Sequence, residues 1–172
     1  MELTEAIKTR RSVRSFSNKP VDEDTIKQII ELGNLAPSAG NLQPRDFVVV
    51  KNQETKEKLT QAALNQKFIA QAPFVIVICA NMKRVTPYGN RGHELYTIQD
   101  TAAAIQNMLL AVVDFGLASC WVGAFNESMV VDILELPSYI RPVAILPIGY
   151  SDTGSKEPSR IPIEDLIRYE KW

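Results

Sequence analysis

The chain has 172 residues, a length that suits one domain, with 45% hydrophobic and 23% charged residues. A net charge of −1 at pH 7 gives no overall attraction to nucleic acid or to an anionic membrane. The longest apolar run, Phe74 to Ala80, is too short to span a bilayer, and the acidic start, Met1 to Glu5, lacks the apolar stretch of a signal peptide. Cys79 and Cys120 stand among apolar neighbours, as reduced buried thiols do. Together these features predict a cytoplasmic protein with no nucleic-acid or membrane partner.

The hydrophobic pattern of the first half of the chain predicts interspersed helices and strands. In chain order we expect a helix from Leu3 to about Thr9, an extended segment at 10–16, a helix that Asp22 caps and that ends near 33–37, a strand at 47–50, one or two helices at 55–70, and the strongest strand at 74–80.

The second half continues the pattern after a polar loop at 83–93, whose Pro87, Gly89 and Gly92 favour irregular backbone. The longest predicted helix, Glu94 to Phe115, is apolar on most sides and should be buried in the core or at a subunit interface. The remaining expected elements are a strand at 119–122, a helix from Asn126 to Leu136, a strand at 142–150 in which Pro147 indicates an edge or an irregularity, and a short helix at 163–169. The whole predicts a single α+β or three-layer α/β domain over residues 1–172.

Several kinds of chemistry are excluded by what the sequence lacks. His93 is the only histidine, so a metal site built from several histidines is excluded, and any Ser-His-Asp hydrolase would have to use it. No two glycines stand two residues apart and no glycine precedes a lysine, so the chain has neither a GxGxxG fingerprint nor a P-loop. A nucleotide-like cofactor would need another binding device.

An arginine cluster near the N-terminus is the first candidate for such a device: Arg10-Arg11-Ser12-Val13-Arg14. In an extended segment Arg10, Ser12 and Arg14 share one face, and guanidinium groups suit a phosphate or a polarised carbonyl. The pattern also fits solvated charges at the end of a helix, where cations favour the helix dipole. A nucleic-acid patch is disfavoured because no aromatic residues are interleaved with these arginines.

A second candidate is the segment from Pro37 to Pro44, which links a predicted helix to a predicted strand. Its small residues let backbone approach a flat ligand closely, and Ser38, Asn41 and Gln43 could donate hydrogen bonds to it. A plain helix-to-strand connection would have the same composition.

Two further stretches could contribute. Trp121 to Asn126 lies between a strand and a helix, where free backbone N–H groups gather and could donate to a ring nitrogen or oxygen. Lys156 and Arg160 place positive charge in the polar tail. Taken alone, the first stretch is better explained as a plain connection between a strand and a helix, and the second as solvated surface charge.

In this order, the stretches resemble the nitroreductase family of FMN-dependent enzymes over nearly the whole chain. The resemblance also covers the predicted helix at 100–116 with its Gln106 to Leu110 run, the stretch from Gly116 to Gly123, Pro142 to Gly149, and Ser159 to Pro162. It implies an α+β, three-layer fold with a central mixed β-sheet flanked by helices. It also implies an intertwined homodimer with two equivalent FMN sites at the interface.

The resemblance further implies which residues bind the cofactor. By position these are Arg10 and Arg11 near the phosphate and ribityl chain, Ser12 and Arg14 at the pyrimidine end of the ring, Ser38, Ala39, Asn41 and Gln43 reaching FMN from the other subunit, Asn65 near the flavin, Gly123 and Ala124 near N5, and Arg160 at the phosphate. The family often has a lysine two residues before the phosphate arginine. Here that position is Pro158, and Lys156 lies two residues earlier.

The function implied by the resemblance is electron transfer from NADH or NADPH through FMN to a nitroaromatic, a quinone or a similar small-molecule acceptor, in a ping-pong cycle. Because FMN carries the hydride chemistry, no catalytic side chain is expected. Phe68, Tyr88 and Phe125 are candidates for the pocket wall or for ordinary core aromatics. Two alternatives remain open: another flavin reaction on the same fold (dehalogenation, oxidation of a peptide heterocycle, or flavin fragmentation) and a non-enzymatic FMN-binding protein.

Overall fold

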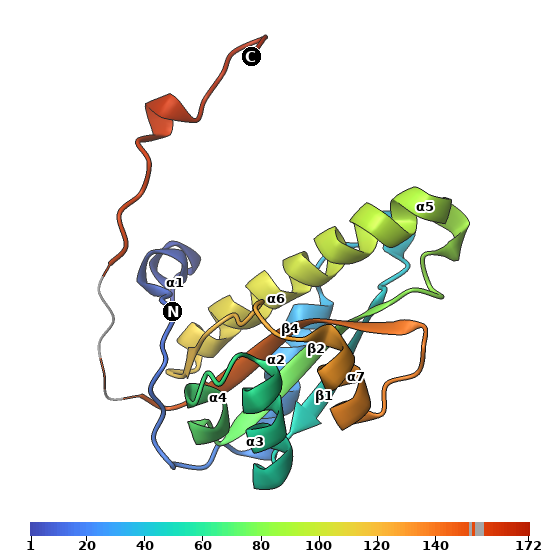
Figure 1. Ribbon diagram of the computed structural model, residues 1–172. Coiled ribbons are helices and arrows are strands. Elements are labelled where there is room, and N and C mark those ends of the chain that lie inside the picture. Colours follow the sequence, from blue (N-terminus) through green and yellow to red (C-terminus); the bar gives the residue numbers. More distant parts are fainter. Residues whose placement is uncertain (152, 154–156) are drawn as a thin grey trace.

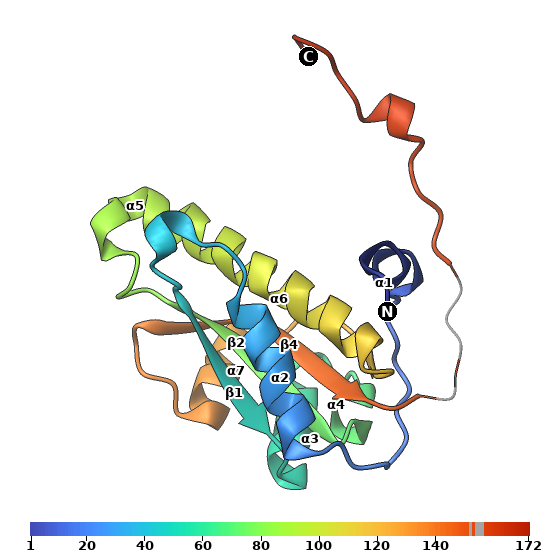
Figure 2. The ribbon, with the colours of Figure 1, turned by 180° about the vertical axis from the view of Figure 1, so that it is seen from behind.

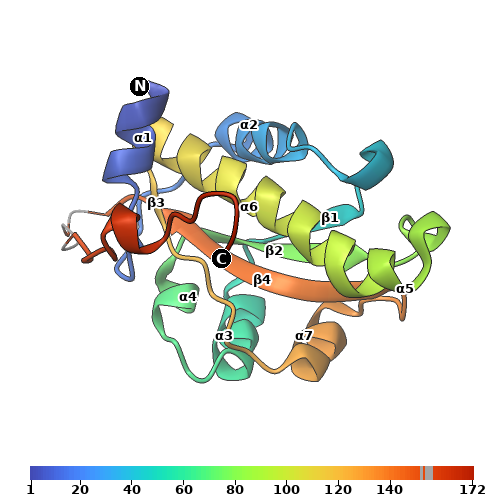
Figure 3. The same cartoon turned by 90° about the horizontal axis from the view of Figure 1, so that it is seen from above.

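A computed structural model describes residues 1–151, 153 and 157–172 and has three layers with a β-sheet in the middle (Figure 1). The four strands are ordered β1-β2-β4-β3 and comprise β1 (Arg45–Val50), β2 (Phe74–Asn81), β3 (Ala118–Ser119) and β4 (Ile140–Gly149). Seen from above, α1, α2 and α6 cover one face of the sheet, and α3, α4 and α7 cover the other (Figure 3). The predicted α+β, three-layer architecture is therefore confirmed.

The strands of the sheet pair antiparallel throughout. In the described part of the chain, parallel pairing is confined to one bridge, between Ser12 and Ser119. The sheet was expected to be mixed, and this bridge is its parallel part among the described residues. It brings the predicted extended segment at 10–16 alongside β3.

Helices α1 (Leu3–Thr9), α2 (Glu23–Asn34) and α6 (Thr97–Asp114) form the layer on one face. Asp22 caps α2 as expected, because its carboxylate accepts a hydrogen bond of 2.8 Å from the N–H of Thr25. The apolar side of α2 packs with α6 and with the residues of β2 that point to this face, Phe74, Ile76 and Ile78. The long apolar helix is thus buried on its sheet side, as its composition predicted.

The opposite layer contains α3 (Gln53–Ala62), α4 (Phe68–Gln71) and α7 (Glu127–Leu134). The side chains of Asn52 and Asn126 cap α3 and α7 by accepting hydrogen bonds from backbone N–H groups three residues ahead. Between these helices and the sheet lies a second apolar cluster, which includes Val75, Val77 and Cys79 of β2. Alternate residues of β2 therefore anchor the two separate cores.

The polar segment at 83–93 is more regular than predicted. It forms a 3-10 turn at Thr86–Tyr88, a helical turn at Gly89–Arg91 (α5) and a π turn at Gly92–Tyr96 that runs directly into α6. Proline in the first turn suits a helix start, because its missing N–H would have no partner there. The prediction of an irregular loop was wrong, and the helical stretch begins before Glu94.

Pro147 lies inside β4, between two neighbouring strands, and not on an edge as one alternative had it. The pairing of β3 with β4 stops after Ser119 and resumes only at the bridge between Val122 and Ile145. The common register places Pro147 opposite Cys120 in this gap, where proline has no N–H to donate. The irregularity that Pro147 indicated is therefore present, and it shortens the predicted 119–122 strand to Ala118–Ser119.

The C-terminal tail runs away from the three layers and is exposed from Glu157 to Trp172 (Figures 1 and 2). In place of the predicted helix at 163–169 it has a 3-10 turn at Ile163–Asp165. An isolated short helix is marginal in water, so a segment without a packing surface does not complete one.

Gly33 lies where α2 packs closely against α6, and this contact generates a prediction about stability. A Cβ atom on Gly33 would overlap the Cγ of Met108, which is fully buried, and would lie 3.3 Å from the carbonyl oxygen of Ala104. We expect Gly33→Val to lower the free energy of unfolding by about 2 kcal/mol, because overpacking outweighs the better helix propensity of valine. Denaturant unfolding at fixed protein concentration measures this, and Met108→Ala in the same background should recover part of the loss. A Gly33→Val protein as stable as the original would contradict the packing.

Candidate functional site

The arginine segment lies against the strand that ends the sheet. The N–H of Val13 donates a 2.9 Å hydrogen bond to the carbonyl of Ser119, next to the Ser12–Ser119 bridge. Burial raises the pKa of the Cys120 thiol, and Arg14, Ser12 and Arg10 all lie close enough to oppose that shift. The influence of all three residues on the Cys120 thiol agrees with the shared face that an extended segment predicts for them.

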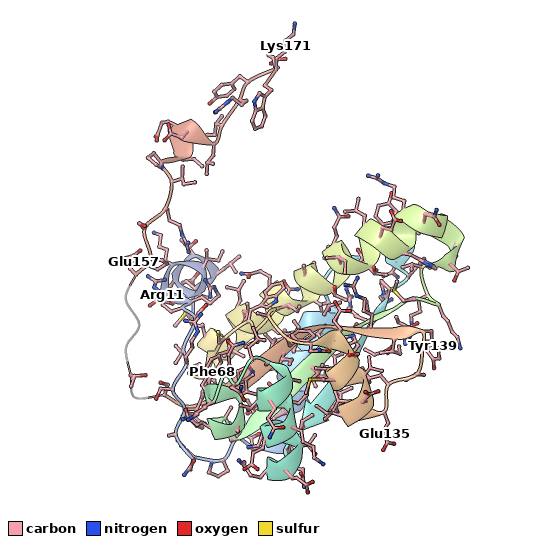
Figure 4. The ribbon with its side chains drawn as sticks, viewed as in Figure 1. Arg11, Phe68, Glu135, Tyr139, Glu157 and Lys171 are labelled. Carbon is pink, nitrogen blue, oxygen red and sulfur yellow. The ribbon has the colours of Figure 1, made fainter. Side chains whose placement is uncertain are left out.

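Arg11 has different partners. Its guanidinium donates to the carbonyls of Lys8 and Arg10 at the end of α1 and lies 3.4 Å from the carboxylate of Glu157 (Figure 4). Arg11 thus joins α1 to the start of the exposed tail.

Asn65 and the 123–124 segment form a second part of the same end of the molecule. Leu64 and Asn65 have left-handed backbone, with φ of 56° and 59°, in the turn after α3. This turn contacts the segment before α7, because the side-chain amide of Gln66 donates to the carbonyl of Ala124 at 3.2 Å. Gly123 and Ala124 are both exposed and follow closely after Cys120 in the chain. The turn with Asn65 therefore lies beside the segment with Gly123 and Ala124, which comes three and four residues after Cys120 in the chain.

The loop with Ser38, Ala39, Asn41 and Gln43 lies elsewhere. It forms the turn after α2 that sits beside α5 in Figure 2, and the N–H of Ala39 donates to the carboxylate of Asp100 near the start of α6. The α1 end of the molecule is tied to the other end of α6, where the Met1 amino group pairs with Asp114. Since α6 rises about 1.5 Å per residue, the two places lie roughly 20 Å apart along this helix. One chain does not assemble all the predicted residues at one point.

The 38–43 loop has an unusual backbone. Gly40, Asn41 and Gln43 have φ of 54°, 55° and 48°, a conformation that costs energy for residues other than glycine. The hydroxyl of Ser38 accepts a 3.0 Å hydrogen bond from the N–H of Gln43, which closes the loop. Its amide side chains are accessible, and the loop is held from beneath by Arg45 and Asp100.

Arg45 and Asp100 are functional candidates that the sequence analysis missed. Both are buried, with 3% and 7% of their surface exposed. Burial raises the pKa of Asp100, while the hydrogen bond from Ala39 and the charge of Arg45 oppose that shift. A signal was present: Asp100 is an acidic residue in a helix that is apolar on most sides, and Arg45 directly follows the candidate segment Pro37 to Pro44.

Arg160 is exposed in the tail, and no ion pair or hydrogen bond joins it to another residue in the described ranges. The structure does not bring it to the other candidates. Lys156, the weaker candidate for the phosphate, lies outside the described residues. Phe68 and Phe125 pack at the edge of the core beneath α3 and α7, whereas Tyr88 is exposed and its ring meets that of Tyr96 edge to face.

The donor set suits a flavin nucleotide better than a metal or a membrane. Guanidinium groups, a hydroxyl and exposed backbone at 123–124 can serve a phosphate and the polar edge of a flat ring. Among the described residues there is no group of three or more histidine, cysteine or acidic side chains that could bind a metal ion. None of the helices in this part of the chain combines the length and apolarity that crossing a membrane requires.

Comparison with known proteins gives consistent matches. The family model described as the nitroreductase family matches residues 7–67 and 60–150. The chain is 30% identical to an FMN reductase [NAD(P)H] of Bacillus subtilis, over 99% of this chain and 74% of that protein, and 30% identical to an NADH dehydrogenase of Thermus thermophilus, over 95% and 93%. The crystal structure of a nitroreductase family protein from Clostridium novyi superimposes with a TM-score of 0.81 at 31% identity and covers 88% of this chain and 87% of that one.

The two cysteines generate a prediction about reactivity. Both are free and buried, and burial, followed by the charge of Asp46, raises the pKa of Cys79 to about 12. Because the thiolate is the reactive form, we expect neither thiol in the folded protein to react at pH 8 with a chromogenic disulfide within minutes. Both should react once the chain is denatured, which serves as the control. Rapid reaction of Cys79 in the folded protein would contradict its placement.

Proposed function

The chain belongs to the nitroreductase family and is an FMN-dependent NAD(P)H oxidoreductase, and from this we propose that it reduces nitroaromatics, quinones or similar small acceptors in a ping-pong cycle. The observation that carries the proposal is the surface formed by Arg10, Ser12 and Arg14, next to the exposed backbone of Gly123 and Ala124. This surface offers cations for a phosphate and donors for the edge of a flat ring, but no nucleophile or acid–base pair. Such a site fits a reaction in which the bound cofactor supplies the hydride chemistry.

In this proposal each residue binds or orients. Arg10 and Arg11 hold the phosphate and ribityl chain, and Arg160 joins them at the phosphate once the tail is in place. Ser12 and Arg14 donate to the pyrimidine end of the ring, where a guanidinium favours the reduced, more negative state. The backbone N–H groups of Gly123 and Ala124 fix the orientation of the ring near N5, and the amide of Asn65 lies beside them.

We propose further that Ser38, Ala39, Asn41 and Gln43 complete the site from the partner subunit of a homodimer. The loop lies at the opposite end of α6 from the arginine segment. In a dimer with twofold symmetry, two such chains placed antiparallel along α6 would bring the loop of each to the arginines of the other and so create two equivalent sites. Each chain would contribute one domain, residues 1–172.

Uncovered apolar surface supports this dimer. A groove of about 320 Å³ lies between α1, α2 and α6, and its lining includes Leu3, Leu32, Leu35 and Leu110. Leu35 is 77% exposed. The tail exposes six further large hydrophobic side chains: Ile161, Ile163, Leu166, Ile167, Tyr169 and Trp172. Apolar surface of this extent indicates an interface that one chain alone leaves open.

We also propose that the protein works in the cytoplasm. Cys79 and Cys120 are buried free thiols, a state typical of chains in a reducing compartment.

The first test is to purify the protein, identify its chromophore and measure turnover. We expect a yellow protein that releases FMN in a one-to-one ratio to chain, as two symmetric sites per dimer require. It should oxidise NADH or NADPH with a quinone or a nitroaromatic as the electron acceptor. Double-reciprocal plots of initial rate against nicotinamide concentration, at several fixed acceptor concentrations, should give parallel lines. Intersecting lines would contradict the ping-pong order. Bound FMN that neither nicotinamide reduces would instead support a non-enzymatic flavin-binding protein.

Arg14 provides a sharper test of the site. Arg14→Gln should lower the midpoint potential of bound FMN by roughly 30–60 mV, because a hydrogen bond from a charged group is worth about 1.5–3 kcal/mol and 30 mV corresponds to about 1.4 kcal/mol in a two-electron couple. Arg10→Gln is the matched control, since a residue at the phosphate should weaken FMN binding and leave the potential nearly unchanged. An unchanged midpoint potential of the bound FMN in Arg14→Gln would contradict a contact between Arg14 and the flavin ring.

A further inference from the structure

A buried pair of charges lies beneath the loop that we assign to the flavin site of the partner subunit. Arg45 stands at the start of β1, and Asp100 lies in the first turn of α6. Neither was a candidate for direct contact with FMN. Both side chains are almost completely buried, so they meet the loop from inside the protein.

Arg45 fastens the chain that leads into the loop. One terminal nitrogen, Nη2, donates to the carbonyls of Asn34 and Ala36, each at 2.7 Å, and Nε donates to the side-chain oxygen of Asn34 at 3.1 Å. The other terminal nitrogen, Nη1, lies 3.4 Å from the carbonyl of Pro37. One planar fork therefore holds three residues at and just after the end of α2, Asn34, Ala36 and Pro37, a geometry that a lysine cannot reproduce.

Asp100 fastens the loop itself. Both oxygens of its carboxylate accept from the N–H of Ala39, at 3.2 and 3.1 Å. The left-handed residues Gly40 and Asn41 come immediately after this contact. Strained backbone persists only where its surroundings constrain it, and the hydrogen bonds that Ser38 and Asp100 accept from the N–H groups of Gln43 and Ala39 provide such a constraint.

A role in folding alone accounts poorly for this pair. Burying a charge is costly, and well-packed apolar residues often stabilise a protein as well or better. Burial lowers the pKa of Arg45 and raises that of Asp100, because the buried surroundings disfavour the charged form of each side chain. What the pair provides, and apolar residues would not, is a fixed direction for the backbone of the loop.

We propose that Arg45 and Asp100 are positioning residues. They hold the 38–43 loop, and the residues that lead into it, in the conformation in which the loop binds FMN across the dimer interface. This inference rests on the proposed function, because it assumes that Ser38, Ala39, Asn41 and Gln43 contact the flavin. It assigns no contact with FMN to Arg45 or Asp100 themselves.

The test compares a graded series at Asp100 with a matched control elsewhere. Asp100→Ala removes the acceptor for the Ala39 N–H, and Asp100→Asn keeps one neutral acceptor oxygen. The control is Lys56→Met, because Lys56, like Asp100, is a buried charged residue with a bond to one backbone group: it is 5% exposed and donates to the carbonyl of Ala72 in the opposite layer. Each variant is examined for thermal stability, for FMN affinity by flavin fluorescence, and for the visible absorption and circular dichroism of the holoenzyme at saturating FMN.

We expect Asp100→Ala to weaken FMN binding at least about tenfold and to change the flavin spectrum at saturation, since the loss of a hydrogen bond to a charged group has effects of that size. Asp100→Asn should recover most of the affinity and of the spectrum. Lys56→Met should lose stability with an unchanged flavin spectrum. The spectrum is decisive, because a change in stability alone does not alter the environment of a flavin that is fully bound.

Two results would overturn the inference. The first is an Asp100→Ala holoenzyme with the FMN affinity and flavin spectrum of the original protein. The second is a series in which FMN affinity falls in proportion to thermal stability, with Lys56→Met following the same relation as the Asp100 variants. Failure of the original protein to bind FMN is a different result, because it removes the proposed function and this inference with it.

Discussion

Strand β2 runs through the middle of the sheet between β1 and β4, and its eight residues are all buried. Because side chains alternate along a strand, Phe74, Ile76 and Ile78 point to one face while Val75, Val77 and Cys79 point to the other. Both faces must then be covered by helices, and a chain of this length supplies one layer for each. Helix α6 belongs to one of these covering layers, and the 38–43 loop and the α1 end of the molecule lie at its two ends.

This arrangement divides the proposed flavin site into two parts of different construction. The arginine segment is an extended piece fixed to β3 by backbone pairing at Ser12 and Val13, so its side chains remain accessible. The 38–43 loop is fixed by side chains instead, through Arg45 and Asp100. Since the two parts lie at opposite ends of α6, the single chain presents two half-sites, and a symmetric pair of chains can complete both at once.

The sequence predicted those features that depend on near neighbours in the chain. Asp22 and Asn126 cap the helices that follow them, because a cap needs only the next three residues. The shared face of Arg10, Ser12 and Arg14 follows from the two-residue period of extended backbone. The regular turns at 86–96 were missed, since their polar composition resembles that of a loop. Asp100 was missed because its contact with Ala39 joins residues 61 positions apart in the chain. Arg45 was missed because its bonds to Asn34 and Ala36, 11 and 9 positions away, form only when the chain folds back on itself.

The C-terminal tail shows the opposite case, in which a local helical pattern does not form a helix. Residues 163–169 have helical spacing, but the apolar side chains there are exposed in the described part of the chain, and only one 3-10 turn forms. A short helix gains most of its stability from packing of its apolar face. The uncovered groove between α1, α2 and α6 has the same deficiency, an apolar surface without a cover. A second copy would supply both missing surfaces, so the dimer that completes the flavin site would also complete the apolar packing that one chain leaves unfinished.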